Sequence, residues 1–129
     1  MSGSSIYVRR ADCRRRDTPI ALVVIEADQL TPDERTAFTL LSSRVDAALL
    51  PNPKQDEFAA LCRQRGCAFD QAAVIATTQH GLPLLLEAAV ALTLRGAGYE
   101  NEAAADMVFK PRSSGGLAAA IEYVCRLVA

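Results

Sequence analysis

Polar residues follow an apolar run near the middle of the chain, and chemistry is first expected at this junction. The run "AAVIAT" (72–77) is typical of a buried strand, and "TTQHG" (77–81) overlaps its end. In α/β proteins, ligands bind outside the carboxyl ends of such strands. The side chains here are hydroxyls, an amide and an imidazole, with no carboxylate among them. Mg²⁺ prefers hard anionic oxygens, so the junction lacks the ligands for a magnesium-dependent reaction.

Three side chains at the junction could still take part in a reaction. Thr77 or Thr78 would act as a nucleophile only if a general base activated the hydroxyl. His80 could act as a general base, because histidine exchanges protons near neutral pH. No sequence neighbour orients its ring, so a histidine on a surface loop is the simpler interpretation.

Charged residues follow two other apolar runs and form a second group of candidates. Asp28 follows "IALVVIEA" (20–27), and Lys54 follows "DAALL" (46–50) after a short proline-containing turn. Lys54 is expected at a helix start, where free N–H groups and the helix dipole favour an anion. A solvated lysine is the alternative. Lys54 could also form a structural salt bridge with Glu26 or Asp28 across neighbouring strand ends.

Strand-like and helix-like segments alternate along the chain, and this alternation predicts the fold. Apolar runs rich in β-branched residues predict strands, and apolar side chains at three- and four-residue spacing predict helices. The predicted strands are residues 20–27, 46–50, 72–77, 91–97 and 107–109, and the predicted helices are residues 31–44, 54–66, 82–90, 101–105 and 116–129. Strands joined through helices are mostly parallel. We therefore expect a three-layer α/β domain whose mainly parallel sheet has helices on both faces.

Several residues are expected to mark where helices begin and end. Thr31, Pro32 and Glu34 have the order of a helix start closed by a capping box. Gly66 suits the left-handed position after a helix. "SSGG" (113–116) is expected to cap the last helix, or alternatively to offer N–H groups to an anion. "RGAGYE" (95–100) predicts a loop in which the tyrosine is a surface or interface residue.

Length and composition indicate one globular domain over residues 1–129. The chain has 129 residues, half of them apolar, and a net charge of −1, so no overall field attracts nucleic acid or a membrane. Residues 1–5 are expected to be disordered. The arginines of residues 9–16 are expected to form a solvated arm, with contact to a phosphate-rich partner as the alternative. No segment has transmembrane length or a signal-peptide pattern, which favours the cytoplasm.

The cysteines and the single histidine do not predict a metal site. The four cysteines are Cys13, Cys62, Cys67 and Cys125. The spacing of Cys62 and Cys67 is not that of a zinc knuckle. We therefore expect buried, reduced thiols.

The order of the segments resembles the haloacid dehalogenase (HAD) superfamily. It is most similar to the cap-less phosphatases that act on 3-deoxy-manno-octulosonate 8-phosphate and to the C-terminal module of some CMP-sialate synthetases. The resemblance covers residues 6–128, and between Lys54 and Ala76 it needs no gap. It is carried by "VVIEAD" (23–28), "LLPNPKQDEFAAL" (49–61), "VIATTQHGLP" (74–83), "AADMVF" (104–109) and "SSGGLAAAIE" (113–122), with Pro83, Asp106 and Glu122 in register. It implies a HAD-like, Rossmannoid fold.

The catalytic residues that this resemblance implies are mostly replaced. The family uses an aspartate nucleophile in an Asp-x-Asp pair on its first strand, and the second aspartate is the general acid and base. Only Asp12 and Asp17, both among arginines, precede the strand at 20–27, so the chain resembles a HAD domain trimmed at its N-terminus. Thr77 and Thr78 stand where the family has magnesium-binding carboxylates.

Two further positions differ, and one is kept. Gly81 stands at another acidic position, and Glu26 replaces a phosphate-binding threonine. Of the catalytic set only Lys54 remains. The resemblance therefore implies a degenerate protein without a metal or other cofactor, in which Glu26, Asp28 and Gly81 are vestigial and Lys54, Thr77 and Thr78 could bind an anion.

The expected role is a non-catalytic binding, scaffolding or oligomerisation module. The alternatives are a hydrolase of a small sugar phosphate that uses Lys54 with Glu26 or Asp28, and simple binding of an anion, a small phosphorylated ligand or a nucleotide. Relatives form tetramers, which implies a homo-oligomer, a tetramer or a dimer, or a partner protein. A missing first strand would leave a sheet edge exposed, which a partner chain or "SIYVRR" (5–10) could cover. Glu26, Lys54 and Thr77 should meet in one pocket.

Overall fold

The computed structural model describes residues 7–8, 19–54 and 56–128. The expectations for residues 1–5 and for the arginine cluster, and that for Cys13, lie outside these ranges. Within them, no helix is both long enough and apolar enough to cross a membrane.

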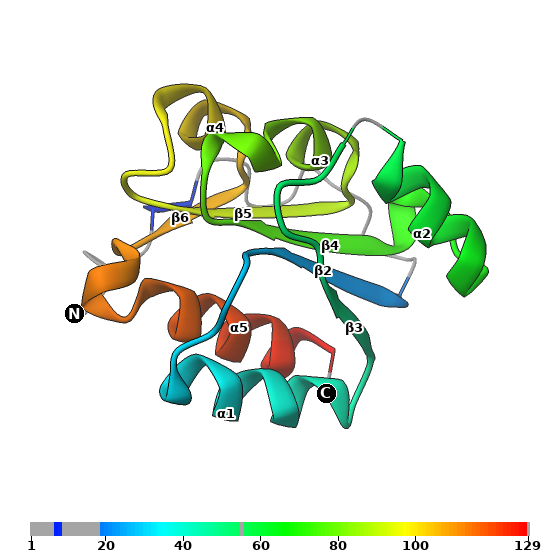
Figure 1. Ribbon diagram of the computed structural model, residues 1–129, viewed down its shortest axis with the longest axis horizontal. Coiled ribbons are helices and arrows are strands. Elements are labelled where there is room, and N and C mark those ends of the chain that lie inside the picture. The colour runs from blue at the N-terminus through cyan, green and yellow to red at the C-terminus, as the bar shows by residue number, and fades with distance from the viewer. Residues whose placement is uncertain (1–6, 9–18, 55, 129) are drawn as a thin grey trace.

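A single sheet forms the middle of the domain (Figure 1). Its strand order is β1-β6-β5-β4-β2-β3. The strands are β1 (Tyr7–Val8), β2 (Leu22–Glu26), β3 (Asp46–Leu49), β4 (Ala72–Ala76), β5 (Val90–Leu94) and β6 (Met107–Phe109). The strands β2 to β6 are all parallel to one another, and β1 is antiparallel to β6. The predicted, mainly parallel sheet is confirmed.

Helices cover both faces of the sheet, which confirms the three-layer prediction (Figure 1). The helices are α1 (Pro32–Ser42), α2 (Glu57–Arg65), α3 (Leu82–Glu87), α4 (Tyr99–Ala104) and α5 (Gly116–Leu127), and short 3-10 turns cover Phe69–Gln71, Gln79–Gly81 and Arg112–Ser114. α1 and α5 lie on one face, and α2, α3 and α4 lie on the other.

The central strand β2 is buried along its whole length, and its side chains supply both cores. Val23 and Ile25 belong to the core under α1 and α5, whereas Leu22 and Val24 belong to the core under α2 and α3. Successive side chains of a strand point to opposite faces, which explains this division. It also explains why the strand is a continuous apolar run rather than an alternating one.

The helix ends agree with the sequence in two places and differ in two others. Thr31 and Glu34 form the predicted capping box, and Gly66 ends α2 with a φ of 71°. α2 begins at Glu57 rather than at residue 54, and Asp56 is the residue before the helix. At 113–116 the serines lie in a 3-10 turn, and Gly115 precedes α5 without a side-chain cap. The predicted segment 113–116 thus supplies the N-cap residue of α5, which is a glycine rather than a serine.

The predicted strand at 91–97 ends earlier, at Leu94. Gly96 and Gly98 have φ values of 97° and 135°, and they turn the chain into α4. Residues with side chains rarely adopt these angles.

No sheet edge is open next to β2, because this strand pairs with β3 on one side and with β4 on the other. The edges of the sheet lie instead at β3 and on the side of β6. Tyr7 and Val8 pair with Val108 and Met107, so the N-terminal segment does cover one edge, that of β6. At the opposite edge, β3 pairs with no described strand other than β2.

Candidate functional site

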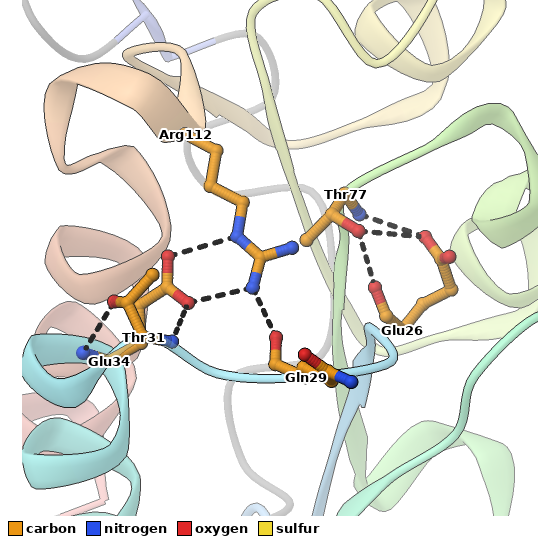
Figure 2. A network of polar contacts seen from close by, with 6 residues as sticks. All are labelled: Glu26, Gln29, Thr31, Glu34, Thr77 and Arg112. Carbon is orange, nitrogen blue, oxygen red and sulfur yellow. Dashed lines mark hydrogen bonds and ion pairs between the residues drawn. The ribbon is translucent and has the colours of Figure 1, made fainter.

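The carboxyl ends of β2 and β4 lie side by side and bring Glu26 together with the threonine pair. Glu26 is in register with Ala76, the residue before Thr77. Glu26 Oε1 accepts hydrogen bonds from the backbone N–H groups of Thr77 and Thr78, each at 2.9 Å, and the Thr78 hydroxyl donates to Oε2, also at 2.9 Å. The Thr77 hydroxyl donates to the Glu26 carbonyl oxygen at 2.6 Å (Figure 2).

These hydrogen bonds explain how a carboxylate can be buried at this position. Glu26 is only 3% exposed, and a buried charge is very unfavourable unless polar groups surround it. Hydrogen bonds from N–H and O–H groups to a carboxylate are among the stronger ones in proteins. The Glu26 carboxylate thus occupies the N–H groups of Thr77 and Thr78, which could otherwise bind an anionic ligand.

Gly81 lets the turn after β4 approach this carboxylate closely. A Cβ atom at this position would lie 2.5 Å from the Ala76 Cβ and 3.0 Å from Glu26 Oε1. The backbone of Gly81 is in the ordinary helical region, with a φ of −85°. The absence of a side chain is therefore required for space and not for conformation. The predicted vestigial residues Glu26 and Gly81 are direct neighbours.

Buried polar residues that the sequence analysis missed support the same turn. The Asn101 side-chain amide donates to the Thr78 carbonyl oxygen at 2.7 Å, and the Thr93 hydroxyl donates to that of Ala76 at 3.0 Å. Both side chains are completely buried. The His80 ring is exposed and has no hydrogen-bond partner among the described residues, which fits a surface-loop histidine better than an oriented base.

A second polar group, also missed, joins the turn before α5 to the start of α1. Arg112 Nε and Nη2 donate to Glu34 Oε2 and Oε1 at 2.9 and 2.7 Å, and Nη2 also donates to the carbonyl oxygen of Gln29. Glu34 Oε1 in addition accepts the N–H of Thr31 at 2.9 Å. Figure 2 shows the guanidinium between the Glu34 carboxylate and the Glu26–Thr77 pair.

The Arg112–Glu34 pair shifts the titration of both groups. The hydrogen bond from Arg112 holds the pKa of Glu34 below its ordinary value, although burial of the carboxylate opposes this, and the Thr31 N–H adds to the lowering. The same hydrogen bond raises the pKa of Arg112, and the nearby charge of Glu26 contributes a little. A paired, bidentate geometry of this kind fixes the guanidinium in position.

An open crevice of about 510 Å³ lies beside the Arg112 side chain. Its walls are formed by Asp28, Gln29, Leu30, Thr31 and Arg112. Asp28 is exposed here, and Arg112 supplies a cation. Of the site residues predicted from the sequence, only Asp28 lines this crevice.

Lys54 does not join the other predicted residues. It is exposed in the turn after β3, and its backbone N–H donates to Glu57 Oε1 at 2.6 Å. Within the described part of the chain it forms no ion pair with Glu26 or Asp28. The predicted salt bridge is therefore wrong. So is the predicted place of Lys54 at a helix start, because α2 begins three residues later. Glu26 and Thr77 meet as expected, but without Lys54.

Comparisons with known proteins find similar solved structures but no similar sequence. No protein-family model matches the sequence, and no curated protein is significantly similar to it. The 3-deoxy-D-manno-octulosonate 8-phosphate phosphatase of Moraxella catarrhalis has a similar structure, with a TM-score of 0.62 and 14% identity over 84% of this chain and 85% of that one. The phosphatase of the same name from Yersinia pestis gives a TM-score of 0.64 and 15% identity over 84% and 80%.

A HAD superfamily hydrolase of Legionella pneumophila is also similar, with a TM-score of 0.53 and 12% identity over 84% of this chain and 87% of that one. The chain has the HAD-like fold. Identities this low establish the fold alone, so the chemistry of the HAD-like domain has to be argued from its own residues.

The strand-end residues of this HAD-like domain do not fit a magnesium ion. Mg²⁺ is held by carboxylate and water oxygens in a nearly octahedral arrangement. Both oxygens of Glu26 already accept hydrogen bonds, and the hydroxyls of Thr77 and Thr78 are neutral. The described residues contain no cluster of three or more histidine, cysteine or acidic side chains that could hold a metal.

Proposed function

We propose that this HAD-like protein is a degenerate relative of the sugar-phosphate phosphatases and acts as a non-catalytic binding, scaffolding or oligomerisation module. The observation that supports this proposal is the Glu26 carboxylate, whose two oxygens are engaged by Thr77 and Thr78 at the carboxyl ends of β2 and β4. A carboxylate held in this way is not available to a metal or a phosphoryl group.

The strand order supports a different assignment for Glu26 and Asp28. The sequence comparison placed Glu26 at a phosphate-binding threonine and took the nucleophile's strand to be missing, and the pairing of β2 with β4 favours replacing both of these expectations. In the related phosphatases, the nucleophilic aspartate and the metal-binding carboxylates serve one reaction centre, so their strands should end side by side. Here β4 lies between β2 and β5, and of these two strands β2 is the one with a pair of carboxylates at its end. It ends in Glu26-Ala27-Asp28, which has the spacing of the family's Asp-x-Asp pair. We infer that Glu26 stands in the place of the nucleophile, with a side chain one methylene longer, and Asp28 in that of the acid–base group.

This assignment sharpens the reason for lost catalysis. Phosphoryl transfer depends on positioned groups and on neutralisation of the developing charge by metal ions and cations. A nucleophile must present a free oxygen in line with the leaving group. In this chain the carboxylate is turned into the backbone, and the neighbouring metal ligands are replaced by hydroxyls.

A hydrolase of a small sugar phosphate is the second candidate, and the crevice at Asp28 favours it. Asp28 and Arg112 line the same open space of about 510 Å³. A cation next to an exposed carboxylate could bind a phosphate and move a proton. The structure of the Moraxella relative contains a magnesium ion, a phosphate ion and KDO, so small phosphorylated sugars are the first ligands to test.

A phosphate-release assay distinguishes these functions. Purified protein is incubated with a panel of small sugar phosphates, with and without Mg²⁺, next to Asp28→Asn and Lys54→Ala. We expect no magnesium-dependent release above the protein-free blank in any of the three. Release by the wild type that Asp28→Asn abolishes would contradict the non-catalytic role. Thermal stabilisation by phosphate without turnover would instead support anion binding.

We also propose that copies of this chain associate. The edge of β3 has no further partner among the described strands, and edges of this kind are usually paired or covered. Leu86 on α3 and Tyr99 on α4 are 62% and 87% exposed, and these helices contact each other. Light scattering over a range of concentrations should give a dimer or a tetramer, whereas a monomer throughout would contradict the proposal. The cytoplasmic location stays a prediction.

A further inference from the structure

Two cysteines are brought together where α2 ends. The N–H of Cys67 donates to the carbonyl oxygen of Cys62 at 3.0 Å, and the N–H of Gly66 donates to that of Arg63 at 3.2 Å. With Gly66 left-handed, this is the Schellman arrangement of a helix end. In this motif the residue after the glycine typically packs against the residue five positions before it.

The burial of the two thiols agrees with this arrangement. Cys62 is 3% exposed and belongs to the core under α2, and the partly exposed Cys67 packs against the same core. Burial raises the pKa of the Cys62 thiol to about 12, and the neighbouring Cys67 adds to this through its charge and a hydrogen bond. One thiol thus lies inside the core under α2, and the other packs against that core at its surface.

The backbone geometry permits a disulfide. A direct hydrogen bond between the two residues keeps their Cα atoms within about 7 Å of each other, given standard bond lengths. Native disulfides span Cα distances of about 4.4 to 6.8 Å. The backbone separation of Cys62 and Cys67 is therefore compatible with a disulfide.

We propose that Cys62 and Cys67 are a redox modification site that forms a reversible intramolecular disulfide when the protein meets a peroxide. The proposal does not depend on the function proposed above. Cys67 reacts first because it reaches the solvent. Its thiolate attacks one peroxide oxygen and the O–O bond breaks, which gives a sulfenic acid and a hydroxide ion. The hydroxide takes up the proton that the Cys67 thiol released and becomes water.

The second step uses the buried thiol. The Cys62 sulfur attacks the Cys67 sulfur, the S–S bond forms, and the S–O bond breaks. The released hydroxide and the Cys62 proton leave as a second water molecule. One molecule of hydrogen peroxide thereby accepts two electrons from the thiol pair, and a dithiol reductant reverses the modification.

Cys125 serves as an internal comparison. It is also free and buried, but it lies on α5 in the core on the other face of the sheet. The sheet separates it from Cys62 and Cys67, so it cannot resolve a sulfenic acid on Cys67. We expect it to stay reduced in the folded protein.

The test uses the full chain with Cys13→Ser and Cys125→Ser, which retains only the proposed pair. Folded protein is treated with an equimolar amount of hydrogen peroxide, quenched with an alkylating agent and measured by intact mass and peptide mapping. We expect a monomer that has lost two hydrogen atoms and takes up no alkyl group, with a dithiothreitol-sensitive link between the peptides of Cys62 and Cys67. The link should form more than tenfold faster in folded protein than in urea.

Three results would overturn the proposal. These are sulfinic acid at Cys67 with Cys62 still free, a disulfide between two chains, and equal rates in folded and unfolded protein. Cys67→Ser in the same background controls for the fold. In this variant Cys62 should resist alkylation in the folded state and react only in urea, and rapid alkylation of folded protein would show that Cys62 is not buried as the structure places it.

Discussion

The carboxyl ends of β2 and β3 differ sharply, although the two strands are neighbours. At the end of β2, Glu26 is buried and bonded to Thr77 and Thr78, which follow the neighbouring strand β4. At the end of β3, the chain enters a turn in which Lys54 is exposed and bonds only through its backbone to Glu57. The family resemblance would place residues of both ends in one reaction centre.

The comparison teaches that two neighbouring strand ends can differ in role: the end of β2 is part of a buried polar network, whereas the end of β3 is exposed. Glu26 now contributes to folding, because its carboxylate satisfies backbone groups that a ligand could otherwise bind. The Lys54 side chain forms no hydrogen bond or ion pair with this network among the described residues. If this division is correct, substitutions in the first region should change stability, whereas substitutions in the second should not.

Glu26→Ala should have the largest effect. It removes the acceptor of two backbone N–H groups and of the Thr78 hydroxyl, and unsatisfied groups of this kind cost about 3 kcal/mol together. Urea unfolding measures the free energy directly. Glu26→Gln is the matched control, because its amide oxygen can still accept the two N–H groups, and it should lose about 1 kcal/mol. Equal stability of all three proteins would mean that the carboxylate is not held as described.

Gly81→Ala should cost about 2 kcal/mol, because the added methyl group would overlap the Ala76 side chain and crowd Glu26. The backbone at Gly81 is ordinary, so only the lack of space is tested. Combining Gly81→Ala with Glu26→Ala shows whether the two sites interact. If the stability losses of the two single variants add up to the loss of the double variant, the two residues do not share a packing site.

Arg112→Ala should destabilise the fold by about 1 to 2 kcal/mol, a value reduced because the Arg112 side chain is about a third exposed. The matched control is Arg95→Ala. Arg95 faces Glu102 at 3.6 Å, and its side chain is 57% exposed. Removal of such a surface pair should cost less than about 0.5 kcal/mol. If Arg95→Ala loses as much stability as Arg112→Ala, the bidentate geometry of Arg112 does not add to the stability of the fold.

The contribution of Arg112 should also depend on pH. The pKa of Glu34 is lowered in the folded protein from an ordinary value of 4.5. A lowered carboxyl pKa gives stability that is fully present above that ordinary value and is lost as the pH falls through the folded value. The stability difference between wild type and Arg112→Ala should therefore shrink below about pH 4.5 in thermal unfolding. A constant difference down to pH 2.5 would contradict the charge pairing.

Lys54→Ala should have the smallest effect, within about 0.5 kcal/mol of the wild type in urea unfolding. The side chain is exposed and has no ion pair among the described residues. A loss comparable to that of Glu26→Ala would mean that the lysine does take part in the strand-end network, and the division between the two regions would fail.

The sequence predicted those parts of the fold that depend on local patterns. β2, β4 and the capping box of Thr31 and Glu34 were readable because each depends on residues close together in the chain. The position of Lys54 could not be predicted, since α2 begins at Glu57, three residues later than the helical pattern suggested. Glu26 was recognised as a departure, but its bonds to Thr77 bridge 51 positions of sequence. Arg112 was missed, because its partner Glu34 lies 78 positions away.

Magnesium titration of the wild-type protein by calorimetry, in the presence of phosphate, tests the central claim most directly. With Glu26 turned into the backbone and hydroxyls in place of the metal ligands, we expect no saturable heat of binding. Stoichiometric binding of Mg²⁺ that disappears in Glu26→Gln would contradict the account, because it would show that this carboxylate remains free to hold a metal.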